Sequence, residues 1–415
     1  MLLCRLNRCD LTDKSCEIVA SALQSSNSPL RDLDLSYNNL GDSGVNLLCA
    51  GLRSPNCKLQ RLDLSYNYLG DLGVELLCAA LMSPKCKLQS LGLGWCNLTE
   101  GCCDVLASVL RSPRSELRDL ELRDNELQDS GVRALSAGLE DPHCKLQRLG
   151  LSGCRVTQIG CDSLASALSS NPSHLRELDL SYNHPGDSGV RALSAAKLDT
   201  LTLLVDHGGE NRTKPGPRKY GCQLTVDPKT ADRWLSLSEE NRRVTQTLER
   251  KKPCRDYPVR CERWPLVVCR ESVCERCYWE AEWSASEGGE VAIAVTDIGI
   301  SKKGGQHESQ SGKNKTSWIL VCNEQRYYAY HNDITAHIPV HPSPYRREGL
   351  CDDAGSGVCV YRVGVYVDLL AGTLSFYRIS DSDTLTLLHR IHTDFTQHTP
   401  LCAGFILWNS SVFFC

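Results

Sequence analysis

The stretch LRDLDLSYNNL, which begins at Leu30, decides the fold because it recurs along the chain. In LDLSYNNL, Leu33 and Leu35 alternate with polar residues, which predicts a short strand. The following segment, GDSGVNLLCAGL (41–52), places apolar residues on one helical face. The repeats therefore predict strand-helix units whose strands form a parallel sheet. The pattern returns every 29 residues, as LQRLDLSYNYL at Leu59, LQSLGLGWCNL at Leu88, LRDLELRDNEL at Leu117, LQRLGLSGCRV at Leu146 and LRELDLSYNHP at Leu175.

The residue that follows each strand suggests the type of repeat. Asn38 stands where a buried turn needs a side-chain amide, and Cys9, Cys96 and Cys154 replace asparagine at this position. The pattern LxxLxLxx(N/C)xL with this period is typical of leucine-rich repeats, and the mixture of Asn and Cys resembles the ribonuclease-inhibitor subtype. This resemblance predicts an α/β leucine-rich-repeat horseshoe of about seven repeats over residues 1–205. Because Met1 already lies at a strand position without a capping unit, we expect this chain to be the C-terminal part of a longer protein.

Aromatic residues divide the chain near residue 205. Of the 26 Phe, Trp and Tyr residues, only five precede that point, so the two halves have differently built cores. The segment DHGGENRTKPGPRKYG (206–221) is rich in glycine, proline and charge, and is predicted to be a linker or lead-in. Beyond it, alternating stretches such as CYWEAEW (277–283) predict an all-β sandwich with Trp279 and Trp283 in its core.

Three blocks in the second half resemble the B30.2, or PRY-SPRY, domain: TVDP (225–228), WEAEW (279–283) and VDLLAGTLSFY (367–377). This resemblance covers nearly all of residues 222–415 and implies a B30.2/SPRY sandwich there. Repeats of this subtype followed by a B30.2 domain resemble the C-terminal region of a NACHT-type NOD-like receptor. That resemblance implies cytoplasmic, innate-immune recognition of protein or microbial ligands. Two alternatives stay open, a substrate-recognition adaptor for ubiquitination, as in tripartite-motif ligases, and a ribonuclease-inhibitor-like stoichiometric inhibitor.

Composition argues against several other classes of protein. A net charge of -4 over 415 residues does not suit nucleic-acid binding. No apolar run approaches the roughly 18 residues of a membrane span. No catalytic or nucleotide-binding motif occurs, so we predict no enzyme and no cofactor. The 24 cysteines are too few for a disulfide scaffold, and we expect reduced thiols. Cys274 and Cys277 have the CxxC spacing of a zinc pair, but no second CxxC follows, so we predict no metal.

Two surfaces are candidate partner-binding sites. On the concave face of the repeats, acidic strand positions are followed three residues later by aromatic rings, a combination that suits a basic protein partner. In the second half, recognition is expected on loops where aromatic anchors lie beside arginines. The candidates on the concave face are Asp34, Tyr37, Asp63, Tyr66, Trp95, Glu121, Asp179 and Tyr182. The candidates on the loops are Arg255, Tyr257, Arg263, Trp264, Tyr345 and Arg346.

Overall fold

A computed structural model of the chain contains two compact units, Met1–Lys219 and Tyr220–Cys415. It describes residues 2–171, 175–196, 201–247, 266–297, 316–344, 359–393, 395 and 400–415. The architectures of the two units confirm the predicted fold class, leucine-rich repeats followed by an antiparallel β sandwich.

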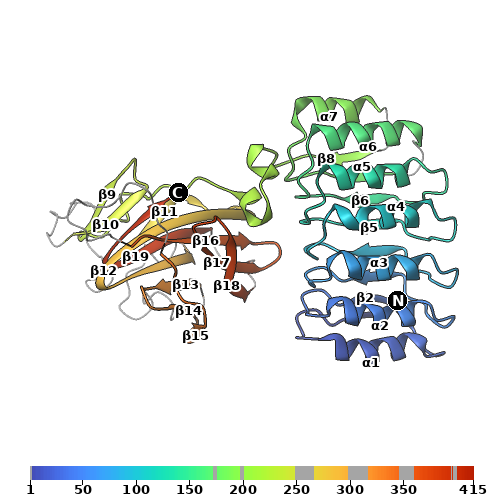
Figure 1. The fold of residues 1–415 in the computed structure, drawn as a ribbon, viewed down its shortest axis with the longest axis horizontal. Coiled ribbons are helices and arrows are strands. Elements are labelled where there is room, and N and C mark those ends of the chain that lie inside the picture. Colours follow the sequence, from blue (N-terminus) through green and yellow to red (C-terminus); the bar gives the residue numbers. More distant parts are fainter. Residues whose placement is uncertain are drawn as a thin grey trace. The chain divides into compact units, whose positions relative to one another are not determined.

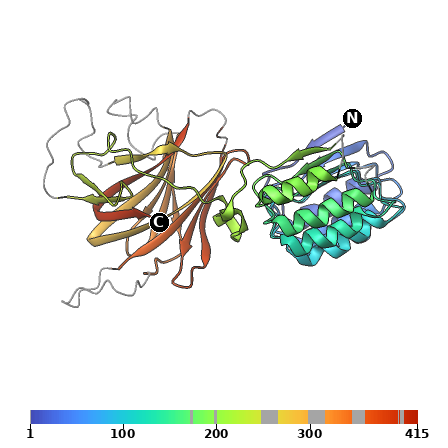
Figure 2. The ribbon, with the colours of Figure 1, turned by 90° about the horizontal axis from the view of Figure 1, so that it is seen from above.

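The first unit, the repeat unit, is built on a parallel sheet whose eight strands lie in sequence order. The helices cover one face of this sheet and leave the other uncovered (Figures 1 and 2). The strands are β1 (Leu2–Arg5), β2 (Leu30–Asp34), β3 (Arg61–Asp63), β4 (Ser90–Gly92), β5 (Asp119–Glu121), β6 (Arg148–Gly150), β7 (Glu177–Asp179) and β8 (Thr202–Leu204). The α-helices are α1 (Asp13–Gln24), α2 (Gly41–Leu52), α3 (Gly70–Leu81), α4 (Cys103–Arg111), α5 (Gln128–Leu139), α6 (Gln158–Ser170) and α7 (Gly186–Ala195). The 3-10 helices are η1 (Glu100–Cys102), η2 (Glu210–Thr213) and η3 (Gly216–Tyr220).

A ladder of leucines forms the core of the repeat unit. Leu33 pairs with Leu62, Leu62 with Leu91, and the same register continues to Leu178 in β7. These leucines are at most 2% exposed. Burying each one contributes about 2 kcal/mol. Because the strand register follows the period of the sequence, any side chain on the open face lies beside its counterparts in the neighbouring repeats.

Asparagine and cysteine share the turn that follows each strand, as the sequence predicts. The amide of Asn125 donates to the carbonyl oxygens of Leu93 and Leu122, both at 2.8 Å. Its oxygen accepts from the backbone N–H groups of Cys96 and Leu98, both at 3.1 Å. An asparagine therefore satisfies backbone donors in the preceding repeat and backbone acceptors in both the preceding repeat and its own.

The lead-in segment, residues 206–219, packs against the turns of the repeats. Lys219 is only 2% exposed, and its Nζ lies 3.3 Å from Glu126 Oε1 and donates to the carbonyl oxygen of Gly153. The other carboxylate oxygen of Glu126 pairs with Arg155 at 2.9 Å, and Arg155 Nε donates to the carbonyl oxygen of Thr213. The N–H of Gly216 donates to Glu126 Oε1 at 3.0 Å. Glu126 thus anchors the segment.

Replacing Glu126 by glutamine should loosen the lead-in segment. A buried ammonium then loses its charged acceptor, which we expect to lower the free energy of local opening by about 2 kcal/mol. Hydrogen exchange at the Gly216 amide should become faster by roughly thirtyfold, while exchange at Leu120 in β5 stays unchanged. The matched control is Glu116→Gln, which removes an exposed pair with Lys145. Unchanged exchange at Gly216 in the Glu126 variant would contradict this assignment.

The second unit, the SPRY unit, is an antiparallel sandwich, and its described part contains the path β15-β14-β13-β12-β16-β17-β18. The long strand β12 pairs with β16 through its first half and with β13 through its second, and it also pairs with β19. Its strands are β9 (Leu235–Ser238), β10 (Arg243–Gln246), β11 (Leu266–Ser272), β12 (Arg276–Asp297), β13 (Ser317–Cys322), β14 (Tyr327–His331), β15 (Ile334–Ile338), β16 (Tyr361–Asp368), β17 (Thr373–Ile379), β18 (Leu385–His392) and β19 (Leu401–Phe414).

The alternation predicted for WEAEW agrees with the core of the SPRY unit. Trp279 and Trp283 are 3% and 1% exposed, and Trp283 stacks on Tyr361 with ring centroids 4.4 Å apart. On the opposite face of β12, Glu280 and Glu282 lie beside Arg362. Aromatic rings therefore contribute to the core of this half together with aliphatic side chains, whereas leucines dominate the core of the repeats.

The expectation that all cysteines are reduced is wrong for one pair. Cys222 and Cys277 form a disulfide, and their sequence separation is 55. Counting cysteines could not reveal this pair, because it joins the segment before β9 to β12 and follows no period. The disulfide also removes Cys277 from any zinc pair with Cys274, which is an exposed free cysteine.

Candidate functional site

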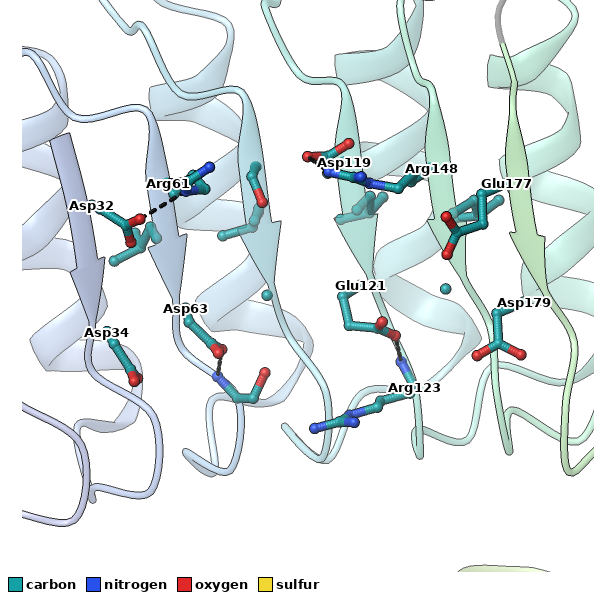
Figure 3. A pocket seen from close by; sticks show the side chains of 18 of the residues that line it. Asp32, Asp34, Arg61, Asp63, Asp119, Glu121, Arg123, Arg148, Glu177 and Asp179 are labelled. Atoms are coloured by element: carbon teal, nitrogen blue, oxygen red, sulfur yellow. Dashed lines mark hydrogen bonds and ion pairs between the residues drawn. The ribbon is translucent and has the colours of Figure 1, made fainter. Parts of the chain in front are cut away.

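The open face of the repeat sheet carries a groove of about 720 Å³. Side chains from β1 through β7 line it. Figure 3 shows that β2 through β7 contribute residues at matching register positions. The groove contains two rows of charged side chains. One row lies at the first residue of the short strands, and the other lies two residues later.

The later row, which we call the acidic row, contains four carboxylates predicted from the sequence. They are Asp34, Asp63, Glu121 and Asp179. Each accepts a hydrogen bond from the backbone N–H two residues further on, at 2.8–3.0 Å. Within the described ranges, none of the four forms an ion pair with a lysine, arginine or histidine. Arg5 occupies the matching register position opposite Asp34, and the Arg123 guanidinium lies near Glu121, so this edge of the groove keeps an excess of carboxylates.

Two glycines interrupt the acidic row and create space for its carboxylates. A Cβ atom at Gly92 would lie 2.5 Å from Asp63 Oδ1, and one at Gly150 would also collide with the carboxylate of Glu121. The side chains of Asp63 and Glu121 thus extend over the neighbouring strand. The glycine positions help to define the shape of the groove although they carry no charge.

The electrostatic environment of Glu121 differs from that of a carboxylate in water. Burial raises the pKa of Glu121, and the nearby Arg123 guanidinium opposes the rise. The carboxylates of Asp179 and Asp124 raise this pKa further. Charges attract more strongly where water is excluded. A further cation placed at this point of the groove would favour the charged form of Glu121 and lower its pKa.

The earlier row, which we call the paired row, balances much of its own charge. Arg61 Nε lies 2.8 Å from Asp32 Oδ2, and Arg148 Nη2 lies 2.7 Å from Asp119 Oδ2. Both pairs join residues that are 29 positions apart and directly opposite in adjacent strands. None of these four residues was selected from the sequence. Opposite charges 29 residues apart, at equivalent positions of neighbouring repeats, are the sequence signal that indicates such pairs.

Three of the predicted aromatic residues form a stack at the strand ends, the aromatic column. Ring centroids of Tyr37 and Tyr66 are 4.1 Å apart and those of Tyr66 and Trp95 are 5.9 Å apart, with nearly parallel planes. The Arg8 guanidinium lies over the Tyr37 ring at 4.7 Å. The backbone is left-handed at this turn, with φ of 57° at Tyr37. Stacking, worth about 0.5–1.5 kcal/mol for each pair, helps to offset the cost of that conformation.

Tyr182 occupies the same repeat position but lies outside the column. It is 7% exposed, and its ring stacks on His207 at 4.6 Å. Arg212 lies over the ring at 5.3 Å. Both residues belong to the lead-in segment, so the chain itself covers Tyr182. The six loop candidates, from Arg255 to Trp264 and at Tyr345 and Arg346, lie outside the described residues.

The structure offers no support for a metal centre. Across the described part of the chain, no group of three or more His, Cys, Asp or Glu residues is placed to hold a metal ion. In the same ranges, no helix is both long and apolar enough to cross a membrane. What the groove does supply is a charged surface beside stacked aromatic rings, which suits binding of another protein.

Comparison with known domain families identifies the parts of the chain. Residues 224–273 match the SPRY-associated domain (PRY), and residues 276–415 match the SPRY domain. Leucine-rich repeats are matched at residues 26–49, 56–78, 116–136 and 171–194. The chain therefore carries leucine-rich repeats, a PRY domain and a SPRY domain in that order. This combination suggests a protein-interaction module.

Individual relatives share part of the chain. Tripartite motif-containing protein 16 of Mus musculus is 34% identical over 202 residues, which are 47% of this chain and 32% of that protein. Neoverrucotoxin subunit beta of Synanceia verrucosa is 34% identical over 179 residues, 43% of this chain and 22% of that protein. The solved TRIM65 PSpry domain aligns at 24% identity with a TM-score of 0.38, covering 48% of this chain and 93% of that one. The match to each of these curated relatives thus spans a third or less of that relative.

Proposed function

We propose that this chain is a non-enzymatic protein-recognition module that binds a basic protein surface in the groove of its repeat unit. The observation that carries the proposal is the acidic row, four carboxylates brought together from strands β2, β3, β5 and β7. Complementary charge steers a partner and orients its arginines and lysines. The adjacent aromatic column adds rigid rings, the kind of side chain that anchors protein interfaces.

We further propose that the module serves a cytoplasmic, innate-immune receptor of the NOD-like class, with B30.2 loops as a second binding surface. The order of repeats, PRY and SPRY domains supports this proposal. Microbial as well as host proteins are candidate ligands. Sequencing the transcript upstream of Met1 tests the receptor context, since a NACHT ATPase is expected there. A complete transcript without one would contradict it.

A substrate-recognition adaptor for ubiquitination is the second candidate function. The similarity to Tripartite motif-containing protein 16 favours it. A stoichiometric inhibitor of a basic ribonuclease is compatible with the same groove. Purification of the full chain with its bound proteins distinguishes the three, because a ubiquitin ligase, a ribonuclease or receptor signalling proteins would each point to one of them.

Neutralising the acidic row should weaken binding of a cationic probe. The variant D34N/D63N/D179N keeps an acceptor oxygen for each backbone N–H but removes three charges. We expect its affinity for a nine-residue arginine peptide at low salt to fall at least tenfold, with a shallower salt dependence. Fluorescence anisotropy of labelled peptide on the full chain gives the affinity.

The matched control, D42N/D104N/D162N, removes the same charge from exposed aspartates on helices α2, α4 and α6. It should lower the affinity less than threefold. Equal losses in both variants would contradict a specific role for the groove, because they would show a response to net charge alone. Far-UV circular dichroism verifies that both variants fold.

A further inference from the structure

The groove continues past the paired row to a second edge of a different character. A further hollow of about 460 Å³ shares Arg61, Ser90, Asp119, Arg148 and Glu177 with the first. Beyond them it is lined by residues at the start of the strands, which we call the basic row and which contain amides and guanidinium groups but no carboxylate. They are Gln60, Gln89, Arg118, Gln147 and Arg176.

The basic row lies at the opposite end of the strands from the acidic row. Arg118 precedes Glu121 by three residues, and Arg176 precedes Asp179 by three. At about 3.3 Å per residue, the two rows lie roughly 10 Å apart. Within the described ranges, the guanidinium groups of Arg118 and Arg176 form no ion pair. The positive edge is therefore as available to a partner as the negative one.

The paired row lies between these two edges and adds little net charge of its own. Its arginines and aspartates neutralise one another across β2–β3 and across β5–β6. A partner lying in the groove thus meets negative charge on one side, a largely balanced floor, and positive charge on the other. A uniformly basic partner would be attracted by the first edge and repelled by the second.

We propose that the natural partner presents a cationic row and an anionic row about 10 Å apart, as on the two flanks of one charge-striped helix. The groove extends over seven strands, which at about 4.8 Å spacing is roughly 29 Å. A helix of about 20 residues has that length and a diameter of about 10–12 Å. This inference rests on the proposed function and adds the polarity and shape of the partner.

Two helical peptides of equal composition, each long enough to fill the groove, test the inference on the full chain. One carries arginines along one flank and glutamates along the other, and the second has the same residues mixed. We expect the striped peptide to bind at least tenfold more tightly than the mixed one. Equal affinities for the two peptides would overturn the inference.

The variant R118Q/R176Q supplies the second arm, because glutamine already occupies this row in three repeats. It should weaken binding of the striped peptide at least tenfold and strengthen binding of the nine-residue arginine peptide about threefold. The control R53Q/R111Q, at the ends of helices α2 and α4, should change neither affinity by more than twofold.

The outcomes separate the two levels of the proposal. Stronger or unchanged binding of the striped peptide to R118Q/R176Q would overturn the inference that the partner contacts both edges of the groove. Binding of the arginine peptide to the full chain would in that case still support the proposed role of the acidic row. If neither the arginine peptide nor the striped peptide bound the full chain, both the inference and the proposed function would be wrong.

Discussion

Replacing Asn125 by alanine should lower the free energy of unfolding of the repeat unit by about 4 kcal/mol. The side chain makes five hydrogen bonds, three as donor and two as acceptor, and is 1% exposed. Removing it leaves several buried backbone groups without partners, and each such group costs about 1–3 kcal/mol. The expected loss of stability is smaller than the sum of these costs because water can enter the vacated space.

The matched comparison is Cys154→Ala in the next repeat. The Cys154 thiol donates to the carbonyl oxygen of Leu122 at 3.1 Å but accepts no hydrogen bond from the preceding turn. Its loss should cost only about 1–2 kcal/mol, since one weak donor is removed and no buried N–H loses its acceptor. The variant Asn125→Cys should resemble Asn125→Ala more closely than it resembles wild type, because a thiol cannot replace the acceptor for Cys96 and Leu98.

Urea unfolding followed by far-UV circular dichroism measures these effects, since the α-helices of the described chain all lie in the repeat unit. Tryptophan fluorescence monitors the SPRY unit separately, because Trp95 is the only tryptophan among residues 1–219. Equal midpoints for Asn125→Ala and Cys154→Ala would show that the acceptor role is unimportant.

The cysteine-containing turns donate to the asparagine of the next repeat. Cys9, Cys96 and Cys154 are each followed one period later by an asparagine. The turn at Cys9 donates its backbone N–H groups to Asn38, just as the turn at Cys96 donates to Asn125. The backbone N–H groups of a cysteine-containing turn thus have an acceptor in the next repeat, as in the Asn38 turn, where the N–H of Leu40 donates to Asn67 Oδ1 at 3.3 Å.

The repeat period accounts for the parts of the repeat unit and its groove that could be predicted from the sequence. A constant repeat length places every equivalent residue at one register position, so the acidic row and the aromatic column follow from counting. Lys219 and Glu126 are 93 positions apart and share no period, so their contact needs the folded lead-in segment. The same holds for Tyr182, whose position follows the repeat while its cover, His207 and Arg212, does not.

The disulfide between Cys222 and Cys277 should stabilise the SPRY unit by up to about 4 kcal/mol when it is formed. Closing a loop of this length restricts the unfolded chain, and the chain-entropy model gives about 4 kcal/mol for it. Other contacts also hold this segment, since the N–H of Cys222 donates to the carbonyl oxygen of Tyr278 at 2.9 Å and Arg276 lies over the Tyr220 ring. Those contacts should preserve the fold after reduction.

Unfolding in urea, followed by tryptophan fluorescence with and without a thiol reductant, measures the contribution of the disulfide. Reductant should lower the midpoint of the wild-type chain to that of C222A/C277A and leave the double variant unchanged. The control Cys274→Ala, which removes a nearby exposed cysteine, should keep the full response to reductant. A wild-type midpoint that ignores reductant would contradict the prediction. In a reducing cytoplasm the less stable, reduced form would predominate, so the same measurement gives the stability at which the proposed receptor module works.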